Sequence, residues 1–194
     1  ELVIDLVNPA GQPERMQLVV RGYNDGFAFC YKIPDGKGPC VNVQSELTAY
    51  NFAGDYTAWF YNGENHNIGP EKLTETDGTR LPVMTVKAGD KHYMAIHEAC
   101  LETGAPLVLQ SKGGESLFSV ASKPTSLSPG YTSAWRVVLY GTTPGVLTDS
   151  HLLELLNPDP DSRYDFSWVK PGLAVWDWRI NGAVWDGFTY GMSY

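Results

Sequence analysis

Residues 16–33 read MQLVVRGYNDGFAFCYKI, and this stretch decides the fold. Two runs rich in Val, Tyr and Phe, residues 16–23 and 27–33, flank the tripeptide Asn24-Asp25-Gly26. Branched and aromatic residues favour strands. Asn and Gly tolerate the positive φ angles that a tight turn between antiparallel strands requires. The stretch therefore predicts a β-hairpin.

The same pattern continues over most of the first 145 residues, where short apolar runs alternate with Gly, Pro, Asn and Asp. The expected strands cover residues 16–23, 27–33, 41–52, 81–88, 92–99, 105–111, 115–121 and 132–141. Residues 71–81 are polar and turn-rich, so they predict a loop. Strands of this kind form antiparallel sheets, which bury their apolar faces by stacking. The expected fold class is mainly β, as an antiparallel β-sandwich.

The composition changes after residue 145. Residues 149–156 predict a short helix, and the proline-bearing residues 158–165 predict a connector. Residues 172–178 then form an apolar run typical of a buried strand. A single strand cannot supply hydrogen-bond partners for the backbone N–H and C=O groups along its two edges. This strand either joins the sandwich or belongs to a second domain that the chain leaves incomplete. We expect a first domain over residues 1–160 and a linker with one strand over residues 161–194.

Charge and composition exclude several classes of partner. The chain has 14 Lys and Arg against 22 Asp and Glu, a formal net charge of −8, which would repel a phosphate backbone. We therefore expect no nucleic-acid partner. No apolar stretch approaches the roughly 20 residues that a membrane-spanning helix needs. The three cysteines form no CxxC pair, so free thiols are expected, with a Cys30–Cys40 disulfide as the alternative.

Four segments, in this order, resemble successive landmarks of glycoside hydrolase family 97, a family of α-glucosidases and α-galactosidases. They are RGYNDGFAFCYKIP (21–34), AIHEACL (95–101), AWRVVLYGTTPGVLTDSHLLELLNP (134–158) and SWVKPGLAVWDW (167–178). Members of that family carry an N-terminal β-supersandwich, then a (β/α)8 barrel and a small C-terminal β-domain. The resemblance implies that residues 1–160 are a sandwich domain incomplete at its start. It also implies that residues 161–194 are a linker and the first strand of a truncated barrel.

The resemblance also implies a function. The chain would be part of a bacterial glycoside hydrolase that removes terminal α-linked glucose or galactose from oligosaccharides, and the protein would be periplasmic or otherwise exported. Glycoside hydrolysis requires two carboxyl groups flanking the scissile bond. In the family both belong to later barrel strands, so no catalytic residue is assigned here and the chain alone should be inactive. The alternative is a non-catalytic carbohydrate-binding or structural β-sandwich module.

Two residues near the C-terminus are candidates for substrate binding. Asp177 ends the predicted strand, where the active-site residues of such barrels gather. The simpler alternative is a structural role, in which the Asp177 carboxylate accepts hydrogen bonds from backbone amides of the loop after the strand. Trp185 follows an Asn-Gly turn, where its ring could stack on a sugar.

Glu98 is the candidate metal ligand. Strand alternation places it at the end of the row formed by His92, Met94 and Ile96. An unpaired buried carboxylate is costly, so pairing with Lys or Arg at the strand end is the simple expectation. The resemblance instead implies a Ca²⁺ ligand that reaches the active site. Ca²⁺ takes 6–8 oxygen ligands, so we expect the other ligands to lie outside this chain.

Overall fold

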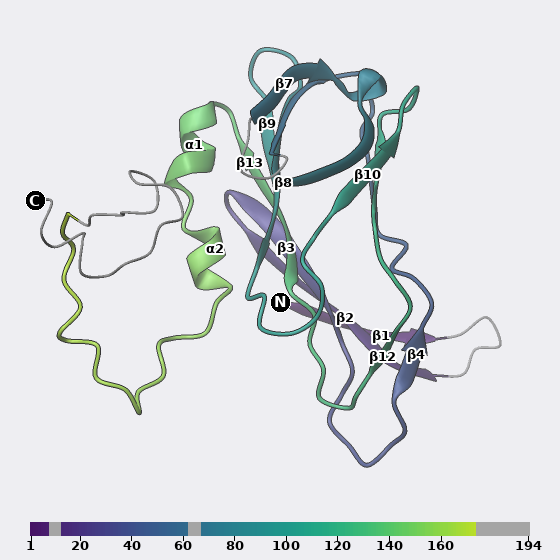
Figure 1. Ribbon diagram of the computed structural model, residues 1–194, viewed down its shortest axis with the longest axis vertical. Helices are drawn as coiled ribbons and strands as arrows, with labels where there is room; N and C mark the ends of the chain where they lie inside the picture. The colour runs from purple at the N-terminus through teal and green to yellow at the C-terminus, as the bar shows by residue number, and fades with distance from the viewer. Residues whose placement is uncertain (8–12, 62–66, 174–194) are drawn as a thin grey trace, which may run out of the picture. The chain divides into compact units, whose positions relative to one another are not determined.

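The computed structural model describes residues 1–7, 13–61 and 67–173, and the paired strands among them are all antiparallel (Figure 1). The strands are β1 (Leu2–Val7), β2 (Pro13–Tyr23), β3 (Gly26–Lys32), β4 (Val41–Val43), β5 (Ala49–Asn51), β6 (Thr57–Tyr61), β7 (Asn67–Lys72), β8 (Asp77–Lys87), β9 (Tyr93–Ala99), β10 (Leu109–Lys112), β11 (Leu117–Val120), β12 (Thr125–Leu127) and β13 (Trp135–Gly141). A 3₁₀ turn, η1 (Leu73–Glu75), and two short helices, α1 (Pro144–Asp149) and α2 (Leu152–Leu155), complete the elements. The fold is therefore mainly antiparallel β, as expected.

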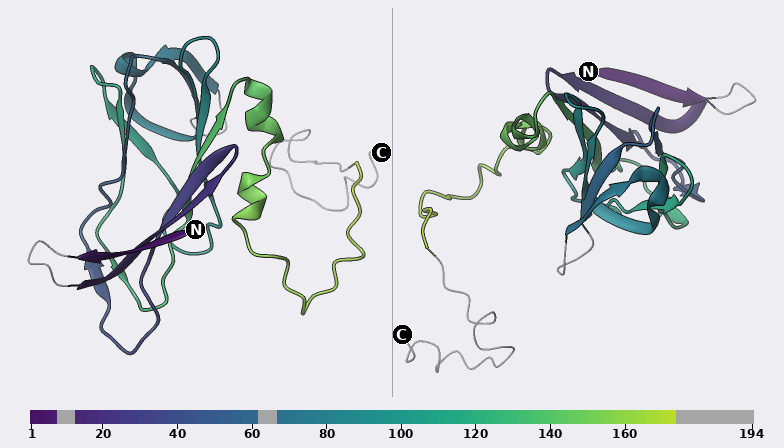
Figure 2. Two further views of the ribbon diagram at one scale, coloured as in Figure 1. Left: turned by 180° about the vertical axis from the view of Figure 1, so that it is seen from behind. Right: turned by 90° about the horizontal axis from the view of Figure 1, so that it is seen from above.

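The long strand β8 belongs to both halves of the main sheet. Its first part, Asp77–Arg80, pairs with β10, whereas Met84–Lys87 pairs with β9. The strand order is β1-β2-β3-β13-β9-β8-β10-β11-β5; outside this path, β6 pairs with β8 and β7 pairs with β6. Figure 2 shows β1 and β2 at one edge of this arrangement. A separate two-stranded sheet pairs β4 with β12. The described strands are consistent with a β-sandwich.

Two hydrophobic clusters lie on opposite faces of the central strands, because side chains alternate along β9 and β13. The first cluster contains Val19, Ala28, Cys30, Ala95, Ala99, Trp135, Val137, Leu139, Leu152 and Leu156. The second contains Ala58, Phe60, Leu73, Met84, Val86, Ile96, Leu107, Leu109, Phe118 and Val120. Ala95 and Ile96 of β9 are neighbours in sequence and fall into different clusters. The central strands are thus covered on both faces.

The two helices cover the face of the first cluster, against β13 and β9 (Figure 1). Pro144 stands in the first turn of α1, where its missing N–H needs no partner. Ser150 separates the helices, and its hydroxyl accepts the N–H of Leu152 over 3.2 Å. Asn157 follows α2 and accepts the N–H of Cys100 over 3.0 Å. Asn157 thereby ties the helical segment to the residue that follows β9.

Most predicted strands are confirmed, and the hairpin at residues 16–33 is formed by β2 and β3 in continuous register. Three expectations were wrong. Residues 41–52 are not one strand, because β4 and β5 belong to different sheets. Residues 71–81 are not only a loop, since β7 ends at Lys72 and β8 begins at Asp77. The strand predicted at 105–111 is β10, displaced to Leu109–Lys112.

Four strands and one helix were not expected: β1, β6, β7, β12 and α1. The helix predicted at 149–156 is shorter, and α2 occupies Leu152–Leu155 within it. The three cysteines are free. Cys30 is buried and Cys40 is exposed, so the alternative disulfide between them is absent.

The chain divides into two compact units, Glu1–Pro158 and Asp159–Tyr194. All the elements named above lie in the first unit. The described part of the second unit, residues 159–173, contains turns and no helix or strand. Gly172 and Leu173 are therefore not in a strand, and the rest of the strand expected at 172–178 lies outside the described residues. Among the described helices, none has the length and apolar character required to cross a membrane.

Candidate functional site

Arg136 is a buried cation in a central strand of the sandwich. It lies in β13, between β3 and β9, where the register places it opposite Phe29 on one side and Glu98 on the other. Only 6% of its side chain is exposed. A buried charge is stable only when other groups pair with it, so the partners of Arg136 define a polar site within an apolar sheet.

Glu46 is the main partner of Arg136. The Nε and Nη2 groups of Arg136 donate to the two carboxylate oxygens of Glu46 over 3.1 and 2.8 Å, which is a bidentate pair. Glu46 lies between β4 and β5, outside any strand, and 18% of its side chain is exposed. Its backbone N–H donates to the Ser122 hydroxyl over 2.7 Å. This hydrogen bond anchors the segment that delivers the carboxylate.

Glu98 is the second carboxylate beside Arg136. Its Oε2 atom accepts the backbone N–H of Leu107 over 2.8 Å and lies 3.5 Å from Nη1 of Arg136. Only 12% of the Glu98 side chain is exposed. The expectation that Glu98 pairs with a cation at the end of its strand is therefore met by Arg136. We call Arg136, Glu46 and Glu98 the arginine cluster.

The charges of the arginine cluster reinforce one another. Burial alone would lower the pKa of Arg136, but the hydrogen bonds that Arg136 donates to Glu46 and the nearby negative charge of Glu46 raise it above its ordinary value. Burial raises the pKa of the neighbouring Tyr50 well above its usual range, so Tyr50 stays neutral. Two carboxylates and one guanidinium leave the cluster with a net charge of −1. The cluster can therefore still attract a cation.

The described residues do not form a complete metal site. They contain no group of three or more His, Cys, Asp or Glu side chains that could hold a metal ion. Glu98 nevertheless has the right chemistry for one ligand, since Ca²⁺ prefers carboxylate oxygen. The net negative charge of the arginine cluster is compatible with that role. Calcium binding by Glu98 stays a prediction.

Asp177 and Trp185, the two residues predicted to bind substrate, lie outside the described residues. The roles of Arg136 and Glu46 were not predicted from the sequence, although Arg136 is a charged residue inside the apolar run AWRVVLY. Such a charge requires a partner, but nothing in the sequence identifies a carboxylate 90 residues away as that partner.

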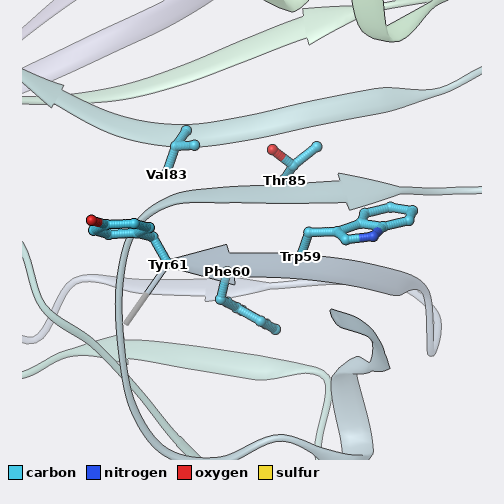
Figure 3. Close-up of a pocket in the computed structure, with 5 residues that line it drawn as sticks. All are labelled: Trp59, Phe60, Tyr61, Val83 and Thr85. Carbon is cyan, nitrogen blue, oxygen red and sulfur yellow. The ribbon is translucent and has the colours of Figure 1, made fainter. Parts of the chain in front are cut away.

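A second feature is an aromatic hollow on the outer face of β6 and β8. It is lined by Trp59, Phe60, Tyr61, Val83 and Thr85 and has a volume of about 250 Å³. Figure 3 shows the Trp59 and Tyr61 side chains on one side of β6 and Phe60 on the other. Trp59 pairs with Thr85 in the ladder. On the side of β6 opposite Phe60, the hollow thus combines the rings of Trp59 and Tyr61 with the Thr85 hydroxyl.

Comparison with known proteins identifies the family. The model of the glycosyl-hydrolase 97 N-terminal domain matches residues 1–158. A retaining alpha-galactosidase of Bacteroides thetaiotaomicron is 27% identical over an alignment of 199 positions, which covers 81% of this chain and 30% of that protein. A probable retaining alpha-galactosidase of Streptomyces bingchenggensis is 29% identical over 188 residues, covering 87% of this chain and 27% of that protein.

A solved structure shares the fold. A glycoside hydrolase family 97 enzyme from Pseudoalteromonas sp. strain K8, in complex with acarbose, matches with a TM-score of 0.72. The identity is 24%, and the match covers 88% of this chain and 27% of that one. The chain thus spans less than a third of the length of these relatives. Because the family model covers residues 1–158, the chain belongs to glycosyl-hydrolase family 97 and carries its N-terminal domain.

Proposed function

We propose that this chain is the N-terminal part of a glycoside hydrolase that removes terminal α-linked galactose or glucose from oligosaccharides. The observation that carries the proposal is the match of residues 1–158 to the N-terminal domain of family 97. Two relatives named retaining alpha-galactosidases favour galactose over glucose. The chain's net charge of −8 suits a neutral sugar better than a phosphorylated substrate.

In this proposal the catalytic carboxylates belong to a barrel that follows the sandwich domain. Residues 161–194 are the linker and first barrel strand, with Asp177 and Trp185 near the substrate. The barrel is then the main partner of the sandwich domain. The short match to the relatives, about 30% of their length, is consistent with this division.

Glu98 is proposed as one ligand of a Ca²⁺ ion whose other ligands come from the barrel. A Ca²⁺ ion held there would supply positive charge that stabilises negative charge developing during the reaction. The chain's own contribution is the Glu98 carboxylate, whose Oε2 atom accepts the N–H of Leu107. The net charge of −1 on the arginine cluster supports this role, because opposite charges attract, whereas a positive cluster would repel the ion.

Two experiments test the proposal. The first is to read the encoding DNA past Tyr194, where we expect an open frame with repeated strand and helix patterns. The second compares the 194-residue chain with the extended protein on p-nitrophenyl α-galactoside and α-glucoside. Only the extended protein should turn over substrate, and EGTA or the Glu98→Gln change should greatly weaken its activity. A stop codon after Tyr194, or turnover by the short chain that Asp177→Asn abolishes, would contradict the proposal.

The aromatic hollow favours a second candidate function, a carbohydrate-binding module. The C–H face of a pyranose ring packs well on aromatic rings, and Trp59 and Tyr61 lie on one side of β6 with Thr85 in the adjacent strand. This candidate predicts that the 194-residue chain binds oligosaccharides without hydrolysing them. Titration of α-galactosyl and α-glucosyl oligosaccharides should then show binding that Trp59→Ala removes and Trp168→Ala, in the second unit, preserves. Absence of binding by the parent chain excludes this candidate.

A further inference from the structure

The register between β9 and β13 determines which side chain of β13 lies beside Glu98. Arg136 and Glu98 are direct cross-strand partners, so their side chains leave the sheet on the same face. That face also carries Ile96, which belongs to the second hydrophobic cluster. Opposite charges facing each other in a sheet stabilise it only modestly when exposed. Here both side chains are nearly buried, so their geometry is fixed by packing as well as by charge.

The guanidinium of Arg136 divides its donors between two carboxylates. Nε and Nη2 are used by Glu46, in a fork that fixes the plane of the group. Nη1 faces Glu98 at 3.5 Å, and it is buried without a hydrogen-bond partner among the described residues. Because these two nitrogens are bonded to Glu46, Arg136 cannot also form a bidentate pair with Glu98 through them. Glu98 is therefore close to the positive charge of Arg136, but only its Oε2 atom faces the guanidinium.

The Glu98 carboxylate is therefore held through only one of its two oxygens, Oε2. Leu107 and Arg136 both approach Oε2 of Glu98. In the part of the chain that the structure describes, Oε1 has no hydrogen bond to any other residue. A carboxylate fixed in this way presents its second oxygen in a set direction. Groups that orient a metal ligand in this manner commonly change metal affinity by about 10–100-fold when they are altered.

We infer that Arg136, fixed by Glu46, is a positioning residue that orients the Glu98 carboxylate as a calcium ligand. The inference rests on the proposed function. It goes beyond it by assigning roles to two residues that touch neither the ion nor the sugar. Arginine is required at this position because only a planar group can bind Glu46 with two nitrogens and face Glu98 with the third. Lysine carries the charge without the fork.

The test measures Ca²⁺ binding to the extended protein by isothermal titration calorimetry, in the absence of substrate. Arg136→Lys and Glu46→Gln should each weaken Ca²⁺ binding by about 10–100-fold. In a Glu98→Gln background, the same two changes should have almost no further effect, because the group that they position is gone. Arg80→Lys is the matched control. Arg80 is also a largely buried arginine near a carboxylate, that of Glu71, and this change should leave Ca²⁺ affinity unaltered.

The outcomes separate the inference from the proposed function. If Glu98→Gln weakens Ca²⁺ binding while Arg136→Lys and Glu46→Gln do not, the positioning role is wrong and the calcium site stands. If the two changes weaken binding equally with and without Glu98, they act on the fold and the positioning role is also wrong. If the extended protein binds no Ca²⁺, or Glu98→Gln has no effect, the calcium proposal fails together with the inference. Should Arg136→Lys not fold, Glu46→Gln decides the question alone.

Discussion

The Ser150 hydroxyl donates a 2.5 Å hydrogen bond to the carboxylate of Asp25, a residue 125 positions earlier in the chain. Asp25 lies in the turn between β2 and β3, and its backbone carbonyl accepts the N–H of Tyr140 over 2.8 Å. The same Ser150 oxygen accepts the N–H of Leu152 at the start of α2. One serine therefore joins the hairpin turn to the helix that covers the first hydrophobic cluster.

Replacing Ser150 with alanine should destabilise the chain by about 1–2 kcal/mol, because it removes a hydrogen bond to a charged group and the acceptor for the N–H of Leu152. Urea unfolding followed by circular dichroism measures the change. Ser45→Ala is the control, since Ser45 is exposed, and it should shift the free energy of unfolding by less than about 0.5 kcal/mol. Equal effects of the two changes would show that the Ser150 hydrogen bond adds no stability.

Gly26 is needed for the close approach of β3 to β13. A Cβ atom at this position would lie 2.3 Å from the Val138 carbonyl oxygen, and the φ angle of Gly26 is +155°. Gly26→Ala should therefore destabilise the chain by about 3 kcal/mol through a backbone clash. Gly22 lies in the same hairpin, and a Cβ atom there would have no neighbour within 4 Å. Gly22→Ala should leave the free energy of unfolding unchanged or raise it by up to about 1 kcal/mol. Similar losses in both variants would contradict the steric explanation.

The β2–β3 hairpin and β13 could be predicted from the sequence because their signals are local: apolar runs and a turn that needs Gly. The strand β7 could not. Its sequence, NIGPEK, contains Gly69, Pro70 and charged residues, all typical of loops. It becomes a strand because β6 supplies its hydrogen-bond partners. Which two segments pair cannot be predicted from the sequence of either segment alone.

The candidate site, too, could be predicted from the sequence only in part. Alternation along β9 correctly placed Glu98 in the row of Ile96, and its burial made an arginine or lysine partner necessary. The identity of that partner depends on the register between β9 and β13. The position of Glu46 depends on an irregular segment anchored through Ser122. Neither the register nor the irregular segment leaves a periodic signal in the sequence.

His97 should make the stability of the fold depend on pH. Burial lowers the pKa of His97 below the usual value of about 6.5, although the Glu98 carboxylate opposes this. The backbone N–H of Glu98 also donates to Nδ1 of His97 over 2.8 Å, which requires an unprotonated Nδ1. Below about pH 6.5 the unfolded chain therefore binds a proton that the folded chain does not, so stability falls as the pH falls from there through the folded pKa.

Urea unfolding at about pH 7.5 and pH 5.5 tests this dependence. His97→Gln should lose part of the acid destabilisation that the parent chain shows. His151→Gln serves as the control, because the His151 side chain is 82% exposed, and it should unfold with the parent's pH dependence. A His97→Gln variant that loses stability toward acid as steeply as the parent would exclude His97 as the source.

The thiols should differ sharply in reactivity. Burial raises the pKa of the Cys30 thiol to about 11. At pH 7.5 nearly all of the Cys30 thiol is therefore protonated, and the thiolate is the reactive form. Cys40 is exposed. A disulfide reagent such as Ellman's reagent should label Cys40 in the folded chain and Cys30 only after unfolding, as peptide mass spectrometry can verify. A Cys40→Ala variant should remove the fast phase, and rapid labelling of Cys30 in that folded variant would contradict the burial argument.

The place of β13 in the sheet has a consequence for synthesis on the ribosome. β3 ends at Lys32, yet its second neighbour, β13, begins at Trp135. At about 5–20 residues per second, the ribosome needs roughly 5–20 s to supply the intervening chain. During that interval the nascent hairpin of β2 and β3 has an open edge beside β3, which is a template for pairing with other chains. Translation speed and chaperone access over this interval therefore bear on how much of the protein reaches the folded state.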